Sequence, residues 1–256
     1  MTQTVYLVVG ASRGIGLAVA TKLSENPDNY VIGSYRTANT ASKLLELAKK
    51  PNVDTVVVDI AHEDCKEQLE KEIAKLTDGL DVAIINAGVS KSPYPILECS
   101  REHFIEHYLT NTVGAVEAYK AAHGFLLKKN TRKVVFTSSI AGSIGTYMPL
   151  PVGAYGASKA ALNFVIKRLS EENASENFSY VGVHPGLVVT DMAHDIIEKA
   201  KSNPTDPTSI AFMEYIKKHG VTAEASAEGI VTTIGMLSPY TSGRLVRVDD
   251  QSDFPA

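Results

Sequence analysis

Tyr155 and Lys159 are the residues whose types and spacing are most suggestive of chemistry. They stand four positions apart, and apolar residues at helical spacing follow them without Pro or Gly, so the pair shares one face of a predicted helix. The ordinary pKa of a phenol, about 10, is too high for ready proton exchange at neutral pH. An ammonium held close stabilises the phenolate and lowers that pKa. We therefore expect Tyr155, tuned by Lys159, to exchange a proton with a substrate oxygen.

The alternative for this pair is a packed Tyr and a surface Lys at chance spacing, since short motifs recur by accident. The composition of the chain limits the fold class and the partners to be considered. Its 256 residues, 44% apolar and 21% charged, suit one large α/β domain or two small ones with a full core. A net charge of −4 without a basic stripe argues against nucleic acid as a partner.

The chain also carries no sign of a membrane or a metal. No apolar run approaches the roughly 20 residues that cross a bilayer, and the N-terminal residues lack the features of a signal peptide. Cys65 and Cys99 have no metal-ligand spacing around them, and the seven His residues are scattered. We expect a cytoplasmic protein without a metal site or a membrane partner.

A glycine-rich turn opens the chain. The β-branched run at 5–9 predicts a buried strand, Gly10, Gly14 and Gly16 follow it, and a helical pattern starts at once. Strand, glycine turn and helix together aim backbone N–H groups and the positive helix end at a phosphate. The sequence therefore favours a bound dinucleotide, the alternative being an ordinary tight turn between a strand and a helix.

The second predicted strand, at 30–35, ends where dinucleotide folds meet the adenosine ribose. No acid stands between Tyr30 and Asn39 to bind the ribose hydroxyls. Arg36 stands there instead, with Arg13 in the glycine turn, and two guanidinium groups suit a 2′-phosphate. We predict NADPH over NADH as the cofactor, although each Arg could also be a solvated surface charge.

Strands and helices then alternate along the whole chain. We expect further strands at 53–58, 82–85, 133–137 and 244–248, and helices near 41–48, 64–76, 101–128 and 223–237. This alternation predicts an α/β fold with a doubly wound parallel sheet (Rossmann fold) of about seven strands and helices on both faces. Residues 1–256 form a single predicted domain, with its ligands at the carboxyl ends of the strands.

Several polar or small residues follow predicted strands at that edge. Asp59 could accept a hydrogen bond from the adenine amino group or cap a turn, and Ala87 and Gly88 leave room for a flat ring. A hydroxyl from Ser138-Ser139 could bond to a substrate carbonyl oxygen or close a turn. Asn111 lies inside the long predicted helix, where we expect it to bond to backbone or bend the helix.

These motifs resemble, in type and order, those of the short-chain dehydrogenase/reductase superfamily. The motifs are the glycine turn, Asn86-Ala87-Gly88, Asn111, Ser138-Ser139 with Gly142, Tyr155 with Lys159, and Pro185-Gly186 with Val188 and Thr190. The resemblance covers essentially the whole chain and points to the compact single-domain branch. Within that branch the chain looks most like the sniffer-like carbonyl reductases and the norsolorinic-acid-ketoreductase-like fungal ketoreductases.

The resemblance implies a role for each matching residue. Tyr155 would protonate a carbonyl oxygen as hydride arrives, Lys159 would bind the nicotinamide ribose and lower the Tyr155 pKa, Ser139 would orient the carbonyl, and Asn111 would hold a water that connects Lys159 to solvent. Val188 and Thr190 would position the nicotinamide carboxamide. The expected cofactor-binding residues are Gly10, Ser12, Arg13, Gly14, Ile15, Gly16, Arg36, Asp59, Ile60, Asn86, Ala87, Gly88, Asn111, Tyr155, Lys159, Pro185, Gly186, Val188 and Thr190.

The substrate side departs from the family pattern in one respect. The 16 positions from Ser139 to Tyr155 are a few more than this branch commonly has, so Ser138 could take the place of Ser139. We expect the apolar loop 147–153 to wall the substrate pocket, and residues of about 191–220 to form a mobile lid. The pocket candidates, each of which could equally be plain core, are Tyr94, Tyr147, Met148, Met192, Phe212 and Met213.

These observations lead to a functional prediction. We expect an NADPH-dependent carbonyl reductase that acts on a neutral, fairly apolar ketone or aldehyde, because no Arg or Lys is evident to hold an acidic substrate. The alternative is an NADPH-binding regulator with little turnover, which would have no need of the Ser, Tyr, Lys and Asn set. The resemblance further implies a homodimer or homotetramer, and His184, next to Pro185, is expected to be structural.

Overall fold

Short runs of β-branched residues form a central sheet that is buried on both faces. The structure is a computed structural model that describes residues 3–91, 94–146, 151–188 and 207–256. All neighbouring strands of the sheet are parallel. In spatial order they are β3 (Val53–Val57), β2 (Asn29–Tyr35), β1 (Thr4–Val9), β4 (Val82–Ile85), β5 (Lys133–Thr137), β6 (Ser179–His184) and β9 (Arg244–Arg247). The predicted doubly wound sheet is confirmed, and its strand order reverses between β1 and β4.

Helices connect these strands. They are α1 (Gly14–Leu23), α2 (Ser42–Leu47), α3 (Cys65–Ala74), α4 (Arg101–Tyr108), the π-helix η3 (Leu109–Gly114), α5 (Ala115–Leu127), α6 (Gly153–Glu172), α8 (Pro207–His219) and α9 (Ala223–Met236). Single 3₁₀ turns are η1 (Ala38–Thr40), η2 (Ile96–Glu98), η4 (Ile140–Gly142), η5 (Ala174–Glu176) and η6 (Pro239–Thr241). The predicted helices at 41–48, 64–76 and 223–237 are confirmed, with ends that differ by at most two residues.

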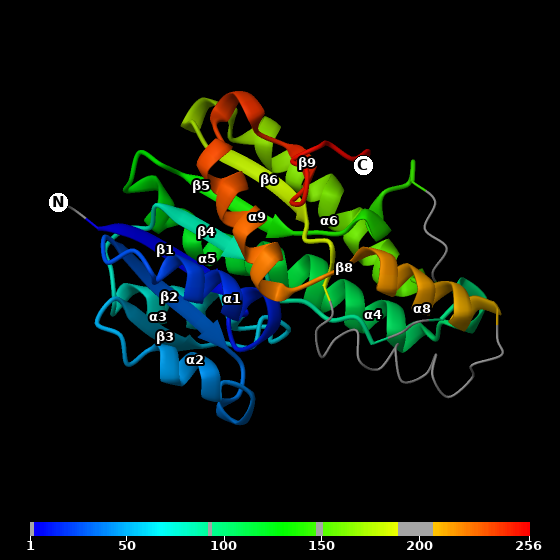
Figure 1. Ribbon diagram of the computed structural model, residues 1–256. Coiled ribbons are helices and arrows are strands. Elements are labelled where there is room, and N and C mark those ends of the chain that lie inside the picture. The colour runs from blue at the N-terminus through cyan, green and yellow to red at the C-terminus, as the bar shows by residue number, and fades with distance from the viewer. Residues whose placement is uncertain (1–2, 92–93, 147–150, 189–206) are drawn as a thin grey trace.

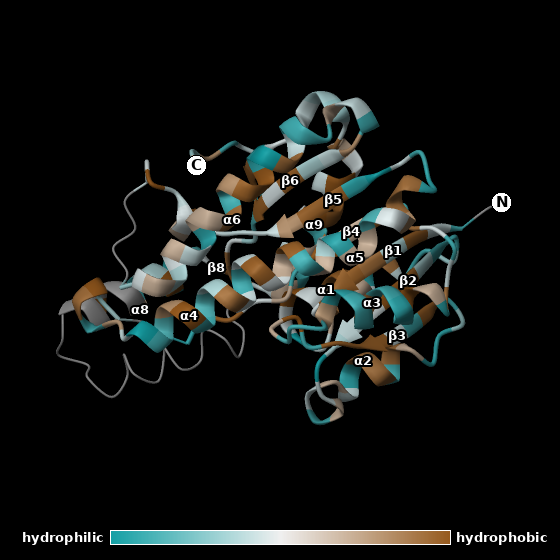
Figure 2. Ribbon diagram, turned by 180° about the vertical axis from the view of Figure 1, so that it is seen from behind, coloured by the Kyte–Doolittle hydropathy of each residue, from teal (hydrophilic) through white to brown (hydrophobic). Residues whose placement is uncertain are grey.

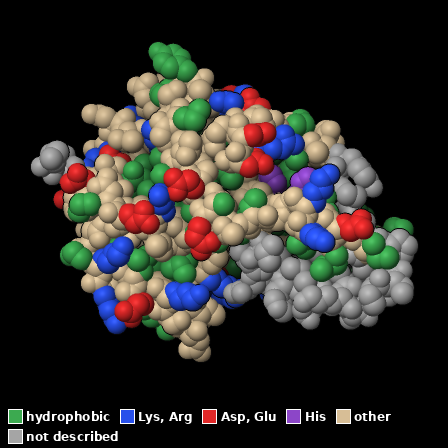
Figure 3. All heavy atoms as spheres, viewed as in Figure 1, with side chains coloured by type: hydrophobic (Ala, Val, Ile, Leu, Met, Phe, Trp, Pro, Cys, Tyr) green, Lys and Arg blue, Asp and Glu red, His purple; other side chains and the backbone are tan. Residues whose placement is uncertain are grey.

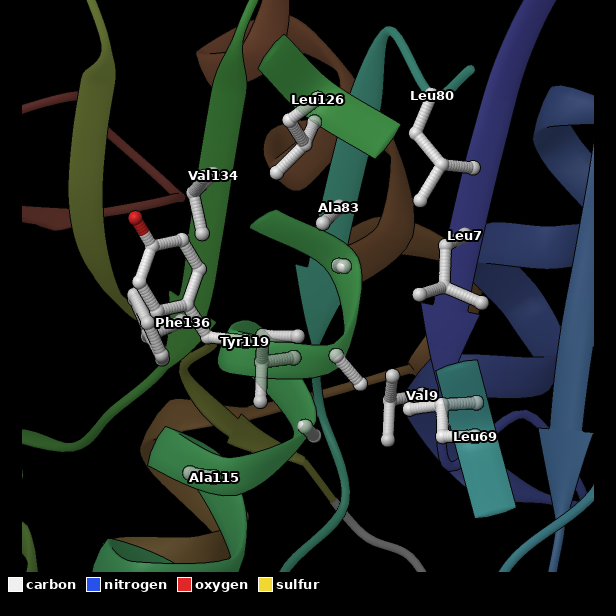
Figure 4. Close-up of a cluster of buried hydrophobic side chains, with 14 of the residues drawn as sticks. Leu7, Val9, Leu69, Leu80, Ala83, Ala115, Tyr119, Leu126, Val134 and Phe136 are labelled. Carbon is white, nitrogen blue, oxygen red and sulfur yellow. The ribbon is translucent and has the colours of Figure 1, made fainter. Parts of the chain in front are cut away.

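Two layers of helices cover the sheet, one on each face (Figures 1 and 2). On one face α1, α2 and α9 bury side chains such as Val19, Leu44 and Ile230. On the other face α3, α5 and α6 do the same, and Figure 4 shows part of that core, with Tyr119 of α5 near Phe136 of β5. A fully buried apolar side chain contributes about 1.5–3 kcal/mol, so both layers are held firmly to the sheet.

The predicted single helix at 101–128 is only partly right. The segment is helical from Arg101 to Leu127, but six residues in its middle, η3, have π-helical hydrogen bonding. The wider turn lets two successive side chains reach the same residue of α6: Asn111 bonds to the Ser158 hydroxyl and Thr112 to the Ser158 carbonyl. π-Helical turns are frequent at functional sites.

A second, small sheet lies beyond the carboxyl end of β6 and was not predicted. It pairs β7 (Leu187–Val188) with β8 (Gly220–Val221) in parallel. The pairing ties the stretch after β6 to the start of α9, on the side of the molecule where α8 lies (Figure 1).

The surface mixes charges of both signs. On the face shown in Figure 3, acidic and basic side chains interleave without forming a stripe of one sign. None of the helices in the described part of the chain is long and apolar enough to cross a membrane.

Candidate active site

The glycine turn joins β1 to α1 as the sequence predicts. Gly10 adopts φ +83°, a region that favours glycine. A side chain on Gly10 would also collide with Ala87, since an added Cβ would lie 2.7 Å from the Ala87 Cα. The turn therefore lies directly against the end of β4, and α1 begins at Gly14 with its first N–H groups at the sheet edge.

Asn86 locks this turn in place. Its side-chain amide donates to the Gly10 carbonyl (2.9 Å), and its side-chain oxygen accepts from the Thr137 hydroxyl (3.1 Å). Asn86 thereby connects the ends of β1, β4 and β5. The packed glycine backbone and the helix start that follows it fit a dinucleotide phosphate, because they present N–H groups and no side chain that blocks a close approach.

The two arginines predicted to bind a 2′-phosphate stand at the ends of neighbouring strands. Arg13 is the N-cap residue of α1, just beyond β1, and Arg36 follows β2, which pairs with β1. Both side chains are exposed. Asp59 caps a turn through a hydrogen bond from the Ala61 N–H (3.0 Å), which is the second of the two roles predicted for it; the neighbouring Ile60 is buried.

The segment after β4 is held by Asn111 of the π-helix η3. The Asn111 side chain is completely buried; its oxygen accepts from the Val89 N–H (2.7 Å) and its amide donates to the Val89 carbonyl (2.9 Å). Gly88 comes so close that an added Cβ would lie 3.0 Å from the Asn111 oxygen and 3.7 Å from Lys159 Nζ. The prediction that Asn111 bonds to backbone is confirmed.

Tyr155 and Lys159 lie in the first two turns of α6, which begins at Gly153. Ser158, between them, fastens these turns to the helix opposite. Its hydroxyl donates to the Tyr155 carbonyl (2.7 Å) and accepts from the Asn111 amide (3.0 Å). Ser158 therefore joins Asn111 to the backbone of the α6 turn that carries Tyr155, while the Lys159 side chain bonds separately to the Thr137 carbonyl.

The two serines after β5 have different partners. The Ser139 hydroxyl is hydrogen-bonded to Tyr155 and also accepts from the Ala141 N–H (3.1 Å). Ser138 is buried and donates to the side-chain oxygen of Asn163, one turn beyond Lys159. Of the two candidates, only Ser139 is placed beside the phenol.

Lys159 is buried beside the Tyr155 ring. Its Nζ lies 5.9 Å from the ring centroid and donates to the Thr137 carbonyl (2.7 Å). Burial lowers the pKa of Lys159 to about 8, because leaving water disfavours the charged form.

The predicted net lowering of the Tyr155 pKa is wrong for this structure, in which that pKa is raised. Burial raises the pKa of Tyr155, and the hydrogen bond with Ser139 opposes that rise only in part. The same loss of water that makes Lys159 easier to deprotonate makes the phenol harder to ionise. The resting site therefore holds a protonated phenol, which is the form that can donate a proton.

The stretch after β6 turns back through Pro185 and Gly186 into β7. Gly186 lies against Val221 of β8, and Val188 is buried. His184, just before the turn, is shielded from water, which lowers its pKa to about 4, and its ring packs edge-on against Phe254. This environment supports the structural role predicted for His184. Thr190 lies outside the described residues.

Comparison with known proteins identifies the family. Residues 4–201 match the short chain dehydrogenase family. The chain belongs to this family. An uncharacterized oxidoreductase of Schizosaccharomyces pombe is 38% identical over 249 residues, which are 97% of this chain and 96% of the relative.

Solved structures of carbonyl reductases resemble this short-chain dehydrogenase over its whole length. The carbonyl reductase Sniffer of Drosophila melanogaster is 26% identical with a TM-score of 0.83, and the alignment covers all of both chains. An NADPH-bound carbonyl reductase from chicken fatty liver is 25% identical with a TM-score of 0.81, again over all of both chains. The family assignment made from the motifs is confirmed.

The substrate side of this short-chain dehydrogenase is described in part. Tyr94 is half-buried, stacks on His103 with ring centroids 5.2 Å apart, and accepts a hydrogen bond from the Gly153 N–H at its carbonyl (3.3 Å). Met213 of α8 is half-buried. Of the predicted pocket and lid residues, those outside the described part of the chain are Tyr147, Met148, Met192, the Phe212 side chain and much of the lid.

Sequence reasoning missed three contributors to this short-chain dehydrogenase site. Thr137 contributes a backbone carbonyl to Lys159, which no residue type could have indicated. Ser158 stands inside the Tyr155–Lys159 motif, and its position on the helix could have marked it. His107 lies one helical turn before Asn111, on the same face, and that spacing was the signal available for it. Within the described residues, no group of three or more His, Cys, Asp or Glu side chains could hold a metal ion.

Proposed function

We propose that this short-chain dehydrogenase is an NADPH-dependent reductase of ketones or aldehydes, acting on carbonyl and CH–OH groups. One observation carries the proposal: a protonated phenol, Tyr155, is hydrogen-bonded to Ser139 at the sheet edge, with the Lys159 ammonium beside it. In this arrangement the phenol can donate a proton, the hydroxyl can hydrogen-bond to the same oxygen, and the amine can stabilise the phenolate.

The proposed mechanism divides the work between cofactor and protein. When bound, the nicotinamide supplies a hydride to the carbonyl carbon. Ser139 donates a hydrogen bond to the carbonyl oxygen and holds it next to Tyr155, which transfers its proton to that oxygen. The carbonyl gains one hydride and one proton and becomes an alcohol. Lys159 stabilises the phenolate that remains, since a nearby positive charge favours the ionised form of the phenol.

The preference for NADPH rests on Arg13 and Arg36. Their strands, β1 and β2, are adjacent and parallel, so both residues stand at one corner of the sheet edge. Exposed guanidinium groups there can bind a 2′-phosphate through charge-assisted hydrogen bonds. The NADPH bound to the chicken carbonyl reductase agrees with this choice, as does the absence of an acid between Tyr30 and Asn39.

A fairly apolar substrate suits the loop that borders the start of α6. An added Cβ on Gly153 would lie 3.1 Å from Ile96, so η2 packs against the helix turn that carries Tyr155. Ile96 and its neighbour Leu97 are 60% and 99% exposed. Exposed apolar side chains at the rim of a site are typical of a binding surface for an apolar ligand.

Absorbance of NADPH with a panel of neutral ketones and aldehydes tests the proposal. We expect turnover by the wild type and a loss of about a hundredfold to ten-thousandfold in kcat for Tyr155→Phe, with NADPH affinity retained because the ring remains. Tight NADPH binding without turnover by either protein would contradict the reductase and favour the NADPH-sensing alternative.

Three further expectations complete the proposal. The chain would act in the cytoplasm, and residues of about 191–220 would close over the substrate.

It would form a homodimer or homotetramer, and exposed apolar side chains on α4, η3 and α6 support a second copy as the partner: Ile105, Tyr108, Leu109, Val113 and Phe164. Sedimentation of the wild type and of Phe164→Ser measures this, and a monomeric wild type would contradict it.

A further inference from the structure

A buried histidine of α4 has no part in the mechanism above. The His107 imidazole is 0% exposed, and both of its ring nitrogens meet backbone groups. Nδ1 lies 2.7 Å from the His103 carbonyl oxygen, and Nε2 accepts from the Lys91 N–H at 3.1 Å. A fully buried, fully hydrogen-bonded polar side chain of this kind holds specific segments together.

These two contacts fix the protonation of the ring. The Lys91 amide can only donate, so Nε2 of His107 must carry a lone pair. The His103 carbonyl can only accept, so Nδ1 must carry the proton. The imidazole is therefore neutral, in the Nδ1–H tautomer.

The segment that His107 holds is the one that follows β4. Asn111, one helical turn further along, binds this segment at Val89, while His107 binds it at Lys91. Gly88 lies just before Val89 in this segment, close to Lys159. Two side chains at i and i+4 on one helix thus fasten the backbone that passes the amine of the site.

His107 also packs against the proton donor itself. Its ring stands edge-on to the Tyr155 ring, with centroids 6.4 Å apart and an interplanar angle of 78°. Edge-to-face packing of this kind fixes the orientation of both rings. The phenol is thereby held by His107 on the ring and by Ser139 at the hydroxyl.

We propose that His107 is a positioning residue for Tyr155: the neutral imidazole of α4 joins the Lys91 backbone to the phenol ring and sets the phenol in its reactive place. The inference rests on the proposed reductase function, since it assigns Tyr155 the role of proton donor. His107 itself touches no reacting atom.

Three substitutions separate the two contacts of the ring. His107→Phe keeps a ring against Tyr155 but leaves the Lys91 N–H without an acceptor. His107→Gln places an acceptor where Nε2 stands, and His107→Asn can replace only the contact made by Nδ1. We expect kcat for ketone reduction to fall about tenfold in His107→Asn, which loses both the ring packing and the acceptor for Lys91, with the KM for NADPH within twofold of wild type. His107→Phe and His107→Gln each keep one of the two contacts and should lose only about threefold.

A matched control comes from the same helix. Glu106 forms an exposed ion pair with the Lys91 side chain, so Glu106→Gln perturbs the neighbourhood without touching the imidazole, and its kcat should stay within twofold of wild type. If His107→Phe fails to fold, the comparison of Gln with Asn decides. Folded variants with the kcat of wild type, or equal loss in Gln and Asn, would overturn the proposal.

The tautomer offers a test that needs no activity. Nitrogen-15 NMR of labelled wild-type protein should show His107 with a protonated Nδ1 and an unprotonated Nε2 near neutral pH. An Nε2–H tautomer or a doubly protonated ring would overturn the inference, even in an active enzyme. By contrast, the reductase proposal fails if the wild type shows no turnover, whatever the tautomer, so the two failures are distinguishable.

Discussion

The two halves of the sheet edge are built on different principles. At the ends of β1 and β2, the groups suited to a phosphate are backbone N–H groups of a glycine turn and two exposed arginines. At the ends of β4 and β5, the chemistry lies on buried side chains, and Asn111, Ser139 and Lys159 each have a hydrogen-bond partner.

This difference predicts how each half responds to substitution. Removing an exposed charge such as that of Arg36 should leave no buried group without a partner, so we expect binding to change while stability does not. Removing a member of a buried network leaves its partners unsatisfied, so activity and stability should fall together. The first half can therefore change its cofactor by single substitutions, whereas the second half is constrained as a unit.

The largest effect is expected for Asn111→Ala, in the buried half. The change removes three hydrogen bonds and leaves the Val89 N–H and carbonyl without side-chain partners. Since each unsatisfied group costs about 1–3 kcal/mol, the free energy of unfolding should drop by roughly 3 kcal/mol, and kcat should drop with it. Denaturant unfolding and NADPH-coupled turnover measure the two quantities.

Thr112→Val is the graded control for that change, because it loses only the single bond to the Ser158 carbonyl and keeps the shape of the side chain. Its loss of stability should be about 1 kcal/mol. An Asn111→Ala protein that loses activity while keeping wild-type stability would contradict the view of this half as one network.

The same contrast explains how far the sequence could predict the molecule. The elements of the exposed half could be predicted because a strand, a glycine turn and a helix are neighbours in the chain. Gly10, Arg13 and Arg36 can be recognised there by residue type. The parallel, doubly wound character of the sheet followed from the alternation of strands and helices. The two-residue strands β7 and β8 were too short to leave a periodic signal, since each exists only through its pairing with the other.

For the buried half, the sequence predicts which residues take part but not how they contact one another. Tyr155, Lys159 and Asn111 stand out as motif residues, yet the Thr137 carbonyl, Ser158 and His107 join them only through tertiary contacts. The direction of the shift in the Tyr155 pKa was predicted wrongly for the same reason. The i+4 spacing revealed a neighbouring amine, but not the burial that raises the pKa of the phenol.

A smaller effect, confined to cofactor binding, is expected at the exposed half. Arg36→Ala should weaken NADPH binding about tenfold to hundredfold, because a hydrogen bond to a charged group contributes about 1.5–3 kcal/mol. NADH affinity and the free energy of unfolding should stay unchanged. Fluorescence titration with both cofactors measures the change, and Lys43→Ala, an exposed cation of α2, is the control.

Unchanged NADPH affinity in Arg36→Ala, or equal use of NADH and NADPH by the wild type, would contradict the assignment of this corner to a 2′-phosphate. A drop in stability would contradict the comparison itself, since it would show that Arg36 takes part in holding the fold.

The smallest effect is a pH dependence centred on Lys159. Its pKa of about 8 means that the ammonium is present below that pH and is lost above it. Tyr155, with a raised pKa, stays protonated across the same range. Ketone reduction should therefore decline several-fold from pH 7 to about pH 9, as the support for the phenolate disappears. A pH–rate profile of kcat/KM measures this decline, and a profile that stays flat to pH 10 would contradict it.

Stability should move in the opposite direction over that range. The pKa of Lys159 falls from 10.5 to about 8 on folding, so the unfolded chain binds more protons between these pH values and the contribution of Lys159 to stability rises with pH. The rise, measured against Lys159→Met, should amount to about 3 kcal/mol at most. Because the ammonium that assists the reaction also opposes folding, activity and the stability difference must diverge above pH 8. A decline of both together would show that Lys159 is not the group responsible.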